Sequence, residues 1–595
     1  MAITTSVSGA ARRSWAERIV SARGFAVIAF VAVFLAGGWS WRTLPVDAFP
    51  DITPPLVQVF TVTDGLSPQE VERYVTFPVE AAMSGLPGLE EVRSNSTFGL
   101  SVVTAYFEDG TDIYLARQLV SERLSAARED IPQGFGEPEL GPITTGLGQV
   151  LFYYLDSADA DLIGLRTLQD WLVKLDLQTV PGVTEVLSLG GYERQYQVNV
   201  RPQALIQYDL SMADVITALE RANLNAGAQY IVENDEQYTV RAEGLLHGEA
   251  DLRQVVVKAV NGVPVVMNEI ADIVVGGAPR QGLATMNGDG EVVAGLVLKL
   301  TGANTNAVIA AVTERLEAVN AALPEGVVAR PYYDQSELVN QAVSTMTTAL
   351  WQGALLVVVL LMAFMGGWRP GLIVAASIPF SVAFALIAMR LLGVSANLMS
   401  LGGIAIAIGM MVDGAVVIVE NARRRLAEGA GGERTLLLAS SLAEVIKPLG
   451  FSIAIVMLVF LPIVTLQGVE GKTFRPLAFA VILAMAGSLV FALVIAPAAS
   501  RLLKAPPRPA QTDAAPGADH RLGAAIGYLV ARRGLAVGLA ALMLATGALA
   551  FTRLGSEFSP RLNEGDILVR MTMAPSISLD AARETVTRFE RDVLE

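Results

Sequence analysis

Apolar residues are concentrated in seven runs of the chain, each about as long as a helix that crosses a lipid bilayer. Such a helix needs roughly 20 consecutive, mainly apolar residues. Trp39 and Trp41 end the first run, as is typical of a membrane–water interface, and no small-residue cleavage site follows them. We therefore interpret this run as a span and predict a multi-pass α-helical membrane protein with about seven spans. The runs are residues 24–42, 347–366, 370–392, 397–421, 446–467, 475–500 and 534–552.

The long stretch between the first two runs has an ordinary polar composition and an α+β pattern. Short β-rich segments alternate with helical patterns such as residues 67–86. Residues 87–94 (PGLEEVRS) recur 94 positions later as residues 181–188 (PGVTEVLS). In both copies a helical stretch precedes the motif and a strand follows it. We predict two split-βαβ subdomains, and chance similarity within a turn is the alternative.

Composition and charge exclude several classes of protein. Of 595 residues, 52% are apolar and 17% are charged, whereas soluble domains are about 45–50% apolar and about 25% charged. The net charge of −15 argues against a nucleic-acid-binding protein. The chain has no cysteine, which excludes disulfides, thiolate metal sites and a cysteine nucleophile.

The distribution of charge predicts the orientation of the chain. Residues 45–345 carry 41 acidic and 17 basic side chains, a net charge of −24. Basic residues instead gather beside the apolar runs, at residues 12–23, 423–434 and 501–533. All three groups lie on one side if every run spans, and the positive-inside rule makes that side cytoplasmic. The acidic stretch is then external.

These patterns divide the chain into six parts. Residues 503–532 are predicted to form a linker because they begin with a Pro- and Ala-rich segment that lacks periodicity. The parts are a cytoplasmic N-terminus with the first span (1–44), the external domain (45–345), spans two to six (346–502), the cytoplasmic linker (503–532), span seven (533–553) and the start of a second external domain (554–595).

Two carboxylates in the fourth run are candidates for proton transfer. A carboxylate at bilayer depth costs on the order of 3 kcal/mol, so such residues usually mark ion pathways. Glu420 follows Asp413 by seven residues, which places it within roughly 20° of the same helix face and about 10 Å along the axis. We predict a proton relay of Asp413 and Glu420. The alternatives are a hydrogen bond from Asp413 to a neighbouring helix and an interfacial ion pair between Glu420 and an arginine.

Glycines in the same run predict close packing of this helix against its neighbours, because a residue without a side chain lets two backbones approach. They are Gly402, Gly403, Gly409 and Gly414.

At these residues the chain resembles the N-terminal half of a resistance-nodulation-division exporter. The one-plus-five arrangement of runs, the VDGAVVIVEN signature at residues 412–421 and Phe49-Pro50-Asp51 carry the resemblance. It implies a twelve-span inner-membrane pump of two similar halves with a periplasmic porter domain. It also implies a homotrimer joined to a periplasmic adaptor and an outer-membrane channel. No cofactor is expected, since the proton gradient supplies energy.

The same resemblance predicts that the chain is a fragment. It stops within a helical pattern that starts near Ser578, so the partners of Asp413 from later spans would be absent.

Several segments are similar to the heavy-metal branch of that family: residues 107–112, 140–150, 165–174 and 555–566. Drug exporters typically carry a second aspartate where this chain has Gly414. The zinc, cobalt and cadmium subgroup usually has an acidic residue where this chain has Ala407. Both positions favour the copper/silver subgroup.

Methionines are the candidate metal ligands, because thioether sulfur is a soft ligand that suits Cu(I) and Ag(I). The resemblance implies a methionine ladder at Met399, Met411 and Met485, although two further ladder positions are Ile418 and Ser500 here. The porter methionine falls at Arg570. Met571 and Met573 lie beside it and would share a face if they form a strand. The alternative is that these methionines fill gaps in apolar cores.

We therefore predict a proton-driven exporter of heavy-metal cations, with Cu(I) and Ag(I) favoured. An exporter of divalent metals or of organic compounds is the alternative within the family, and Arg570 favours the latter because it would repel a cation. A protein-translocation accessory or a receptor is the alternative from another class. No phosphate-binding glycine loop or catalytic constellation indicates an enzyme. His247, Glu564 and Asp566 are weaker candidate sites.

Overall fold

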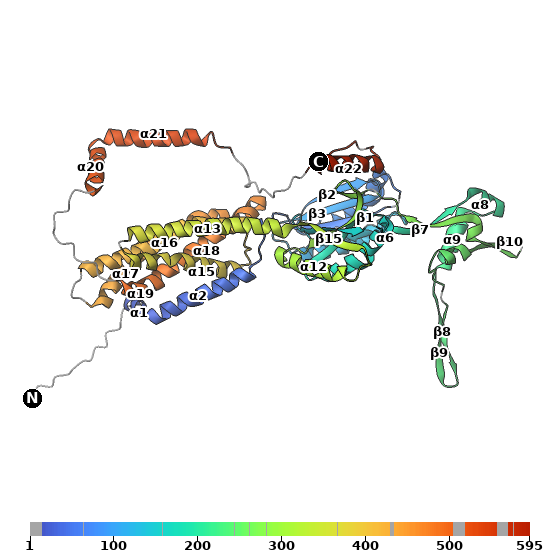
Figure 1. Cartoon of the computed structure of the whole chain (residues 1–595), viewed down its shortest axis with the longest axis horizontal. Helices are drawn as coiled ribbons and strands as arrows, with labels where there is room; N and C mark the ends of the chain where they lie inside the picture. The colour runs from blue at the N-terminus through green and yellow to red at the C-terminus, as the bar shows by residue number, and fades with distance from the viewer. Residues whose placement is uncertain are drawn as a thin grey trace, which may run out of the picture. The chain divides into compact units, whose positions relative to one another are not determined.

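The computed structural model describes residues 15–63, 65–157, 159–242, 244–260, 262–280, 282–365, 367–428, 433–503, 518–555, 569–574 and 576–594. The chain forms two compact units (Figure 1). We call residues 1–52 with 338–569 the helical unit, and residues 53–337 with 570–595 the sheet unit.

The described residues include seven helical segments that are long and apolar enough to cross a membrane. Each of the seven predicted apolar runs overlaps one of them. The segments are α2 (Arg23–Thr43), α13 (Gln335–Phe364), α14 with α15 (Trp368–Ala375 and Ser377–Leu391), α16 (Leu398–Glu428), α17 (Arg434–Val464), α18 with η3, α19 and η4 (Gly468–Val490, Phe491–Ile495, Ala496–Ala499 and Ser500–Leu502) and α21 (Arg533–Phe551).

Helix α16 lies at the centre of the helical unit, where it packs against α14, α15, α17 and α18. Gly403 makes the contact with α18 close: a Cβ atom at this position would lie 2.6 Å from the Leu477 carbonyl oxygen. A Cβ atom at Gly414 would make a tight contact, 3.3 Å from Cδ1 of Ile453, whereas Gly402 and Gly409 have nothing within 4 Å of a Cβ. Of the four glycines predicted to permit close packing, only Gly403 and Gly414 therefore face another helix in the described structure.

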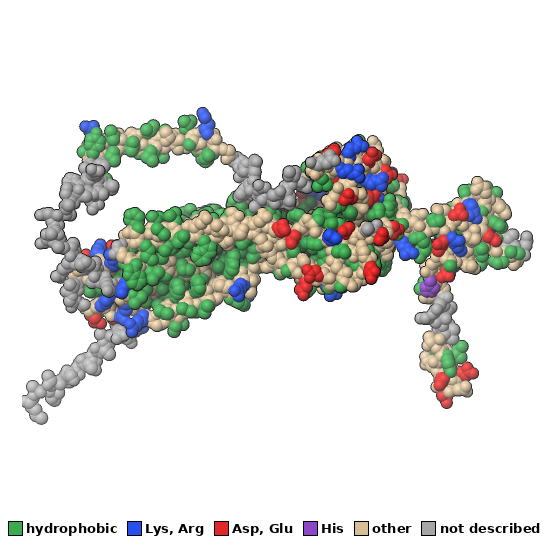
Figure 2. Space-filling model, viewed as in Figure 1, with side chains coloured by type: hydrophobic (Ala, Val, Ile, Leu, Met, Phe, Trp, Pro, Cys, Tyr) green, Lys and Arg blue, Asp and Glu red, His purple; other side chains and the backbone are tan. Residues whose placement is uncertain are grey.

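Basic side chains tie several helix ends together at one end of the helical unit (Figure 2). The short helix α1 (Trp15–Ser21), which precedes α2, packs against α17 and α19 there. The first residues of α17 and the last residues of α13, α16 and η4 thus gather at the same end. The bonds run from Arg423 to the Met365 carbonyl, from Arg434 to the Leu503 carbonyl, from Arg501 to the Thr435 hydroxyl and from Arg369 to the Leu502 carbonyl.

The sheet unit begins with a four-stranded antiparallel sheet of strand order β2-β3-β1-β4. Three short helical segments connect β1 to β2, and one long helix connects β3 to β4. The buried side chains of the sheet and of these helices form one apolar core. The elements are β1 (Leu56–Val62), α3 (Pro68–Val71), η1 (Glu72–Thr76), α4 (Phe77–Met83), β2 (Leu89–Thr97), β3 (Leu100–Phe107), α5 (Ile113–Asp130) and β4 (Pro138–Leu140).

A second sheet has the corresponding strand order, β6-β14-β5-β15, and β13 pairs with the first residues of β14. The connections correspond too, so residues 87–94 and 181–188 both lead into the second strand of a copy. Both copies follow the β-α-β-β-α-β order of a split βαβ. The elements are β5 (Gln149–Ser157), α6 (Leu162–Leu168), η2 (Gln169–Val173), α7 (Lys174–Leu177), β6 (Val183–Leu189), β13 (Ala284–Met286), β14 (Gly290–Lys299), α12 (Thr305–Asn320) and β15 (Val327–Asp334).

The second copy differs from the first by a long insertion between β6 and β14. It has its own apolar core and an antiparallel hairpin, β8 with β9. The inserted elements are β7 (Arg194–Val200), α8 (Pro202–Tyr208), α9 (Met212–Ala222), β8 (Ala226–Glu233), β9 (Glu236–Ala242), α10 (Glu249–Gln254), β10 (Val256–Val260), β11 (Val263–Val266), α11 (Met267–Ile270) and β12 (Ala271–Gly277).

Two further helices lie in the C-terminal part of the chain. Helix α20 (Ala518–Ala531) precedes α21 in the chain. Helix α22 (Leu579–Leu594) contacts the turn between β13 and β14, where Glu590 accepts a hydrogen bond from the Gly288 amide at 2.7 Å. Arg583 of the same helix forms a 3.1 Å ion pair with Glu291 at the start of β14. Residues 579–594 are therefore anchored on the second sheet.

The close approach at Gly403 yields a stability prediction. Gly403→Ala should force α16 away from α18 and destabilise the helical unit by about 1–3 kcal/mol, because the clashing atom is a backbone oxygen that cannot rotate away. Thermal unfolding of the protein in detergent would measure the loss. Gly402→Ala is the matched control on the same helix, and equal stability of the two variants would contradict the prediction.

Candidate functional site

Asp413 lies on an open face of α16. Its exposed neighbours on that face are Ile406, Gly409, Val417 and Glu420, which are spaced three or four residues apart, as expected for one side of a helix. Among the described residues, no hydrogen bond or ion pair reaches the Asp413 carboxylate. The described structure thus does not show the predicted alternative, a hydrogen bond from Asp413 to a neighbouring helix.

Glu420 shares this open face with Asp413 but has a different environment. Its carboxylate forms an ion pair with Arg423 at 3.3 Å, and the Glu420 side chain is 60% exposed. Arg423 also donates to the Met365 carbonyl, at the end of the unit where the basic residues gather. The structure therefore shows the ion pair that was considered as the alternative to a relay role for Glu420.

Met411, one of the candidate metal ligands, lies on the side of α16 opposite Asp413. Met411 is fully buried and belongs to the same apolar cluster as Met485 of α18. The Ser488 hydroxyl of α18 donates to the Met411 carbonyl, which fixes the two helices beside each other. Met399 is also buried, in the first turn of α16. It precedes Met411 by twelve residues, which is about 18 Å along a helix axis.

Asp413 and Met411 are thus separated by face, whereas Met399 precedes Asp413 by fourteen residues and is separated from it along the helix axis. Asp413 follows Met411 by only two residues, but two steps of about 100° turn its side chain away from the buried cluster. Ile418 and Ser500, which replace two expected ladder methionines, are buried as well. Burial alone therefore does not distinguish a ligand from a core residue.

The segment around Met571 and Met573 differs from the prediction. Residues 569–574 form no strand, so the two methionines do not share a strand face. A strand needs a neighbouring backbone for its hydrogen bonds, and none of the described strands pairs with this segment. Met571 is 37% exposed, and Arg570 is exposed beside it.

The weaker candidates do not assemble into a site. His247 is exposed, and its backbone amide donates to Asp251. Glu564 and Asp566 lie outside the described residues. Within the described ranges, no group of three or more His, Asp and Glu side chains could hold a metal ion.

Residues 165–174, one of the segments that resemble the heavy-metal branch, have a structural role that the sequence did not reveal. Buried Gln169 is hydrogen-bonded to the Tyr153 hydroxyl, and burial raises the pKa of Tyr153. Asp170 accepts a hydrogen bond from Ser188 and pairs with Arg166 at 2.7 Å. The segment therefore holds its helix on β5 and β6 of the second sheet.

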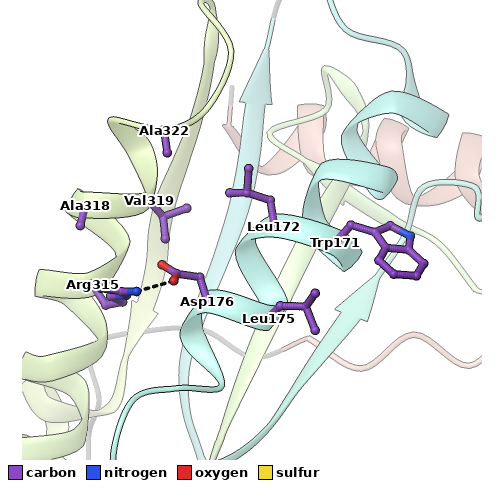
Figure 3. A pocket seen from close by; sticks show the side chains of 8 residues that line it. All are labelled: Trp171, Leu172, Leu175, Asp176, Arg315, Ala318, Val319 and Ala322. Carbon is purple, nitrogen blue, oxygen red and sulfur yellow. Dashed lines mark hydrogen bonds and ion pairs between the residues drawn. The ribbon is translucent and has the colours of Figure 1, made fainter. Parts of the chain in front are cut away.

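The other side of this segment forms a shallow groove with α12 (Figure 3). Trp171 and Leu175 line one wall, and Val319 lines the other. An ion pair between Arg315 and Asp176 crosses the groove. Trp171 is 76% exposed. It is therefore not a core residue, although it is aromatic and lies within an apolar helical pattern.

Comparison with known proteins decides the family. Residues 16–595 match the AcrB/AcrD/AcrF family. The chain belongs to this family. Its members are transporters and not enzymes. The fold agrees with the X-ray crystal structure of a heavy metal efflux pump, with a TM-score of 0.85 and 32% identity over 97% of this chain and 56% of that one.

Curated relatives place the chain near heavy-metal exporters. It is 41% identical over 600 residues to the cobalt-zinc-cadmium resistance protein CzcA of Cupriavidus metallidurans, covering 96% of this chain and 56% of that protein. It is 37% identical over 605 residues to the cation efflux system protein CusA of Escherichia coli strain K12, covering 98% of this chain and 56% of that protein. The chain thus spans about half the length of the curated relatives it matches.

These relatives confirm the resemblance to the heavy-metal branch. The two identities are similar, so they do not single out the copper/silver subgroup within that branch.

The two environments on the open face of α16 yield a prediction. Glu420→Gln should lower stability by less than about 1 kcal/mol, because an exposed ion pair contributes little. Arg423→Gln should lower stability more, since Arg423 is largely buried and also donates to the Met365 carbonyl at the end of α13. Thermal unfolding in detergent would compare them, and a larger loss for Glu420→Gln would refute this assignment.

Proposed function

We propose that this chain forms part of a proton-driven exporter of heavy-metal cations in the bacterial inner membrane. Family membership and the relatives named above support export of metal. The observation that carries the proton-driven step is Asp413, which lies on the open face of a 31-residue apolar helix and has no hydrogen bond or ion pair among the described residues. No resident cofactor is needed, since the metal is substrate and the proton gradient is the energy source.

The surface of the helical unit supports its place in a bilayer. Figure 2 shows hydrophobic side chains over its visible face. Helices α13 and α17 expose large apolar side chains, among them Trp351, Phe364 and Phe451. Such a surface is unfavourable in water and favourable in lipid. The positive-inside rule then makes the basic end cytoplasmic, and the sheet unit becomes the periplasmic porter domain.

The open face of α16 is the part of the helical unit that lipid would not suit. A carboxylate facing lipid costs several kcal/mol, so Asp413 should face protein or a water-filled path. We assign this role to the half of the relatives' length that this chain does not span. Uptake of a proton by Asp413 would neutralise its carboxylate, weaken its interaction with the protein or water that faces it, and shift α16.

Replacing Asp413 tests the proton-driven step. Asp413→Asn keeps the shape of the side chain but cannot exchange a proton, so metal tolerance should fall to the level of a pump-deficient host. Asp413→Glu is the control and should keep part of the tolerance. Metal-tolerance assays would measure both, with membrane levels of the protein compared. Full tolerance with Asp413→Asn would show that this carboxylate does not drive export.

For the substrate we propose Cu(I) or Ag(I), because buried thioethers line the contact between α16 and α18. Thioether sulfur binds these soft ions without losing a proton. Divalent cobalt, zinc or cadmium is the second candidate, and the 41% identity to a cobalt-zinc-cadmium resistance protein favours it.

Two conservative substitutions separate these substrates. Met411→Leu and Met485→Leu nearly conserve volume, so each should cost less than about 1.5 kcal/mol of stability. If the sulfurs bind metal, tolerance to silver and copper should fall severalfold, with tolerance to zinc unchanged. Met389→Leu is the matched control, because Met389 is also fully buried but lies on α15. Unchanged silver and copper tolerance in both variants would exclude these ligands.

For the assembly we propose a homotrimer that joins a periplasmic adaptor and an outer-membrane channel, as the resemblance implies. The β8–β9 hairpin (Figure 1) is the candidate for contact with a neighbouring protomer, since most of its described side chains are exposed. No nucleic acid partner is expected.

A further inference from the structure

The chain that leaves α2 is hydrogen-bonded to the chain that enters α16. Val46 and Ala396 form a parallel β-bridge. The Ala396 amide donates to the Pro45 carbonyl at 2.9 Å, and the Asp47 amide donates to the Ala396 carbonyl at 3.1 Å. A third bond, 3.2 Å long, joins the Leu398 amide to the Ala48 carbonyl. We call residues 45–48 and 395–400 the junction.

Asn397 makes the junction continuous with helix α16. It is fully buried, and its side-chain oxygen accepts from the Met399 and Ser400 amides, each at 3.0 Å. The backbone amide of Asn397 donates to the Ser400 hydroxyl at 2.9 Å. This is the geometry of a helix N-cap, in which the side chain satisfies amides that the helix leaves unpaired. The bridge residue and the first turn of α16 are therefore held as one piece.

Apolar packing stiffens the same place. Leu44, Ala396 and Leu401 are buried in one cluster with Met389 of α15 and Ala480 of α18. A segment fixed by three backbone bonds and a close-packed cluster cannot slide freely along α16. Displacement of the first turns of α16 therefore displaces residues 45–48.

From residues 45–48 the covalent chain runs directly to the centre of the first sheet. Strand β1 begins at Leu56 and is bonded to β3 on one side and β4 on the other. The connecting residues include Pro50, Pro54 and Pro55. Proline fixes its own backbone angle φ and makes a short connection semi-rigid. A pull at the junction is thus passed to a central strand.

The second sheet is attached to a different helix. Its edge strand β15 ends at Asp334, and α13 begins at the next residue, Gln335. The first sheet is therefore tied to α16, and the second sheet is tied to α13. Movement of α16 relative to α13 changes the relation between the two sheets.

We propose that the junction transmits displacement of α16 to the first sheet, with Asn397 as its positioning residue. The proposal rests on the proposed function, because it requires α16 to move during transport. It concerns how that movement leaves the membrane helices, whatever drives it.

Spin labels can test the proposal, because the chain has no cysteine of its own. Labels at Glu122→Cys on α5 and Glu317→Cys on α12 report on the two sheets, and both positions are exposed. The protein would be reconstituted in liposomes, and the distance between the labels measured by pulsed electron resonance with and without an imposed proton gradient. We expect the gradient to shift the distance distribution in the otherwise unsubstituted protein.

Asn397→Ala should abolish that shift and metal transport, whereas Asn397→Asp should retain both because Asp also caps helices. Asn421→Ala is the matched control. Asn421 is a buried asparagine at the other end of α16, where it donates to the Ser441 carbonyl at 3.0 Å, and its loss should leave the shift in place.

A second variant avoids the helix cap. Replacing Pro50, Pro54 and Pro55 together with glycine should reduce the shift, because a flexible connection absorbs the displacement. The proposal is overturned if folded Asn397→Ala and the triple glycine variant both shift as the unsubstituted protein does, or if that protein shows no shift. The Asp413→Asn variant separates the two hypotheses: a normal shift there refutes the proton-driven step, while the Asn397 variants still judge the junction.

Discussion

A carboxylate in the middle of an apolar helix is the constraint on which the rest of this structure depends. Asp413 cannot face lipid without a cost of several kcal/mol, and in the described structure it faces no protein partner either. If α16 spans a bilayer, the side of the helix that carries Asp413 therefore requires a polar neighbour or water. The other side must supply the packing that holds α16 in place, which explains why Met411, Gly414 and Ala415 are buried while Asp413 and Val417 are exposed.

This division of faces sets different rules for the two kinds of candidate residue. The methionines lie where close packing already selects for apolar volume, so their burial is equally consistent with a core role and with binding a soft metal. Asp413 lies on an exposed face of an apolar helix, where packing does not require a polar side chain. Its presence there therefore calls for a functional reason. The case for Asp413 therefore rests on where it lies, whereas the case for Met411 and Met485 rests on the chemistry of sulfur.

Much of the fold followed from local patterns in the sequence. Apolar runs predicted the seven long helices, because a continuous apolar run about 20 residues long is a local property. Their ends were harder to predict: α16 continues to Glu428, beyond the predicted run, and in this extension Arg424 and Arg425 pair with Glu444 of α17. The 87–94 repeat corresponds to two sheets of the same strand order. Trp171 and the segment at Met571 could not be placed, since their exposure depends on elements far away in the chain.

The two sheets share a topology but are attached to different helices. The two sheets are copies of one topology, yet the first follows a proline-rich connection tied to α16 and the second runs without a break into α13. Two identical domains on one rigid support would move together and leave any cleft between them unchanged. Duplication is useful for alternating access only if the two copies are attached to parts of the helical unit that can move separately. The backbone bonds between Pro45–Ala48 and Ala396–Leu398 provide such an attachment for the first copy.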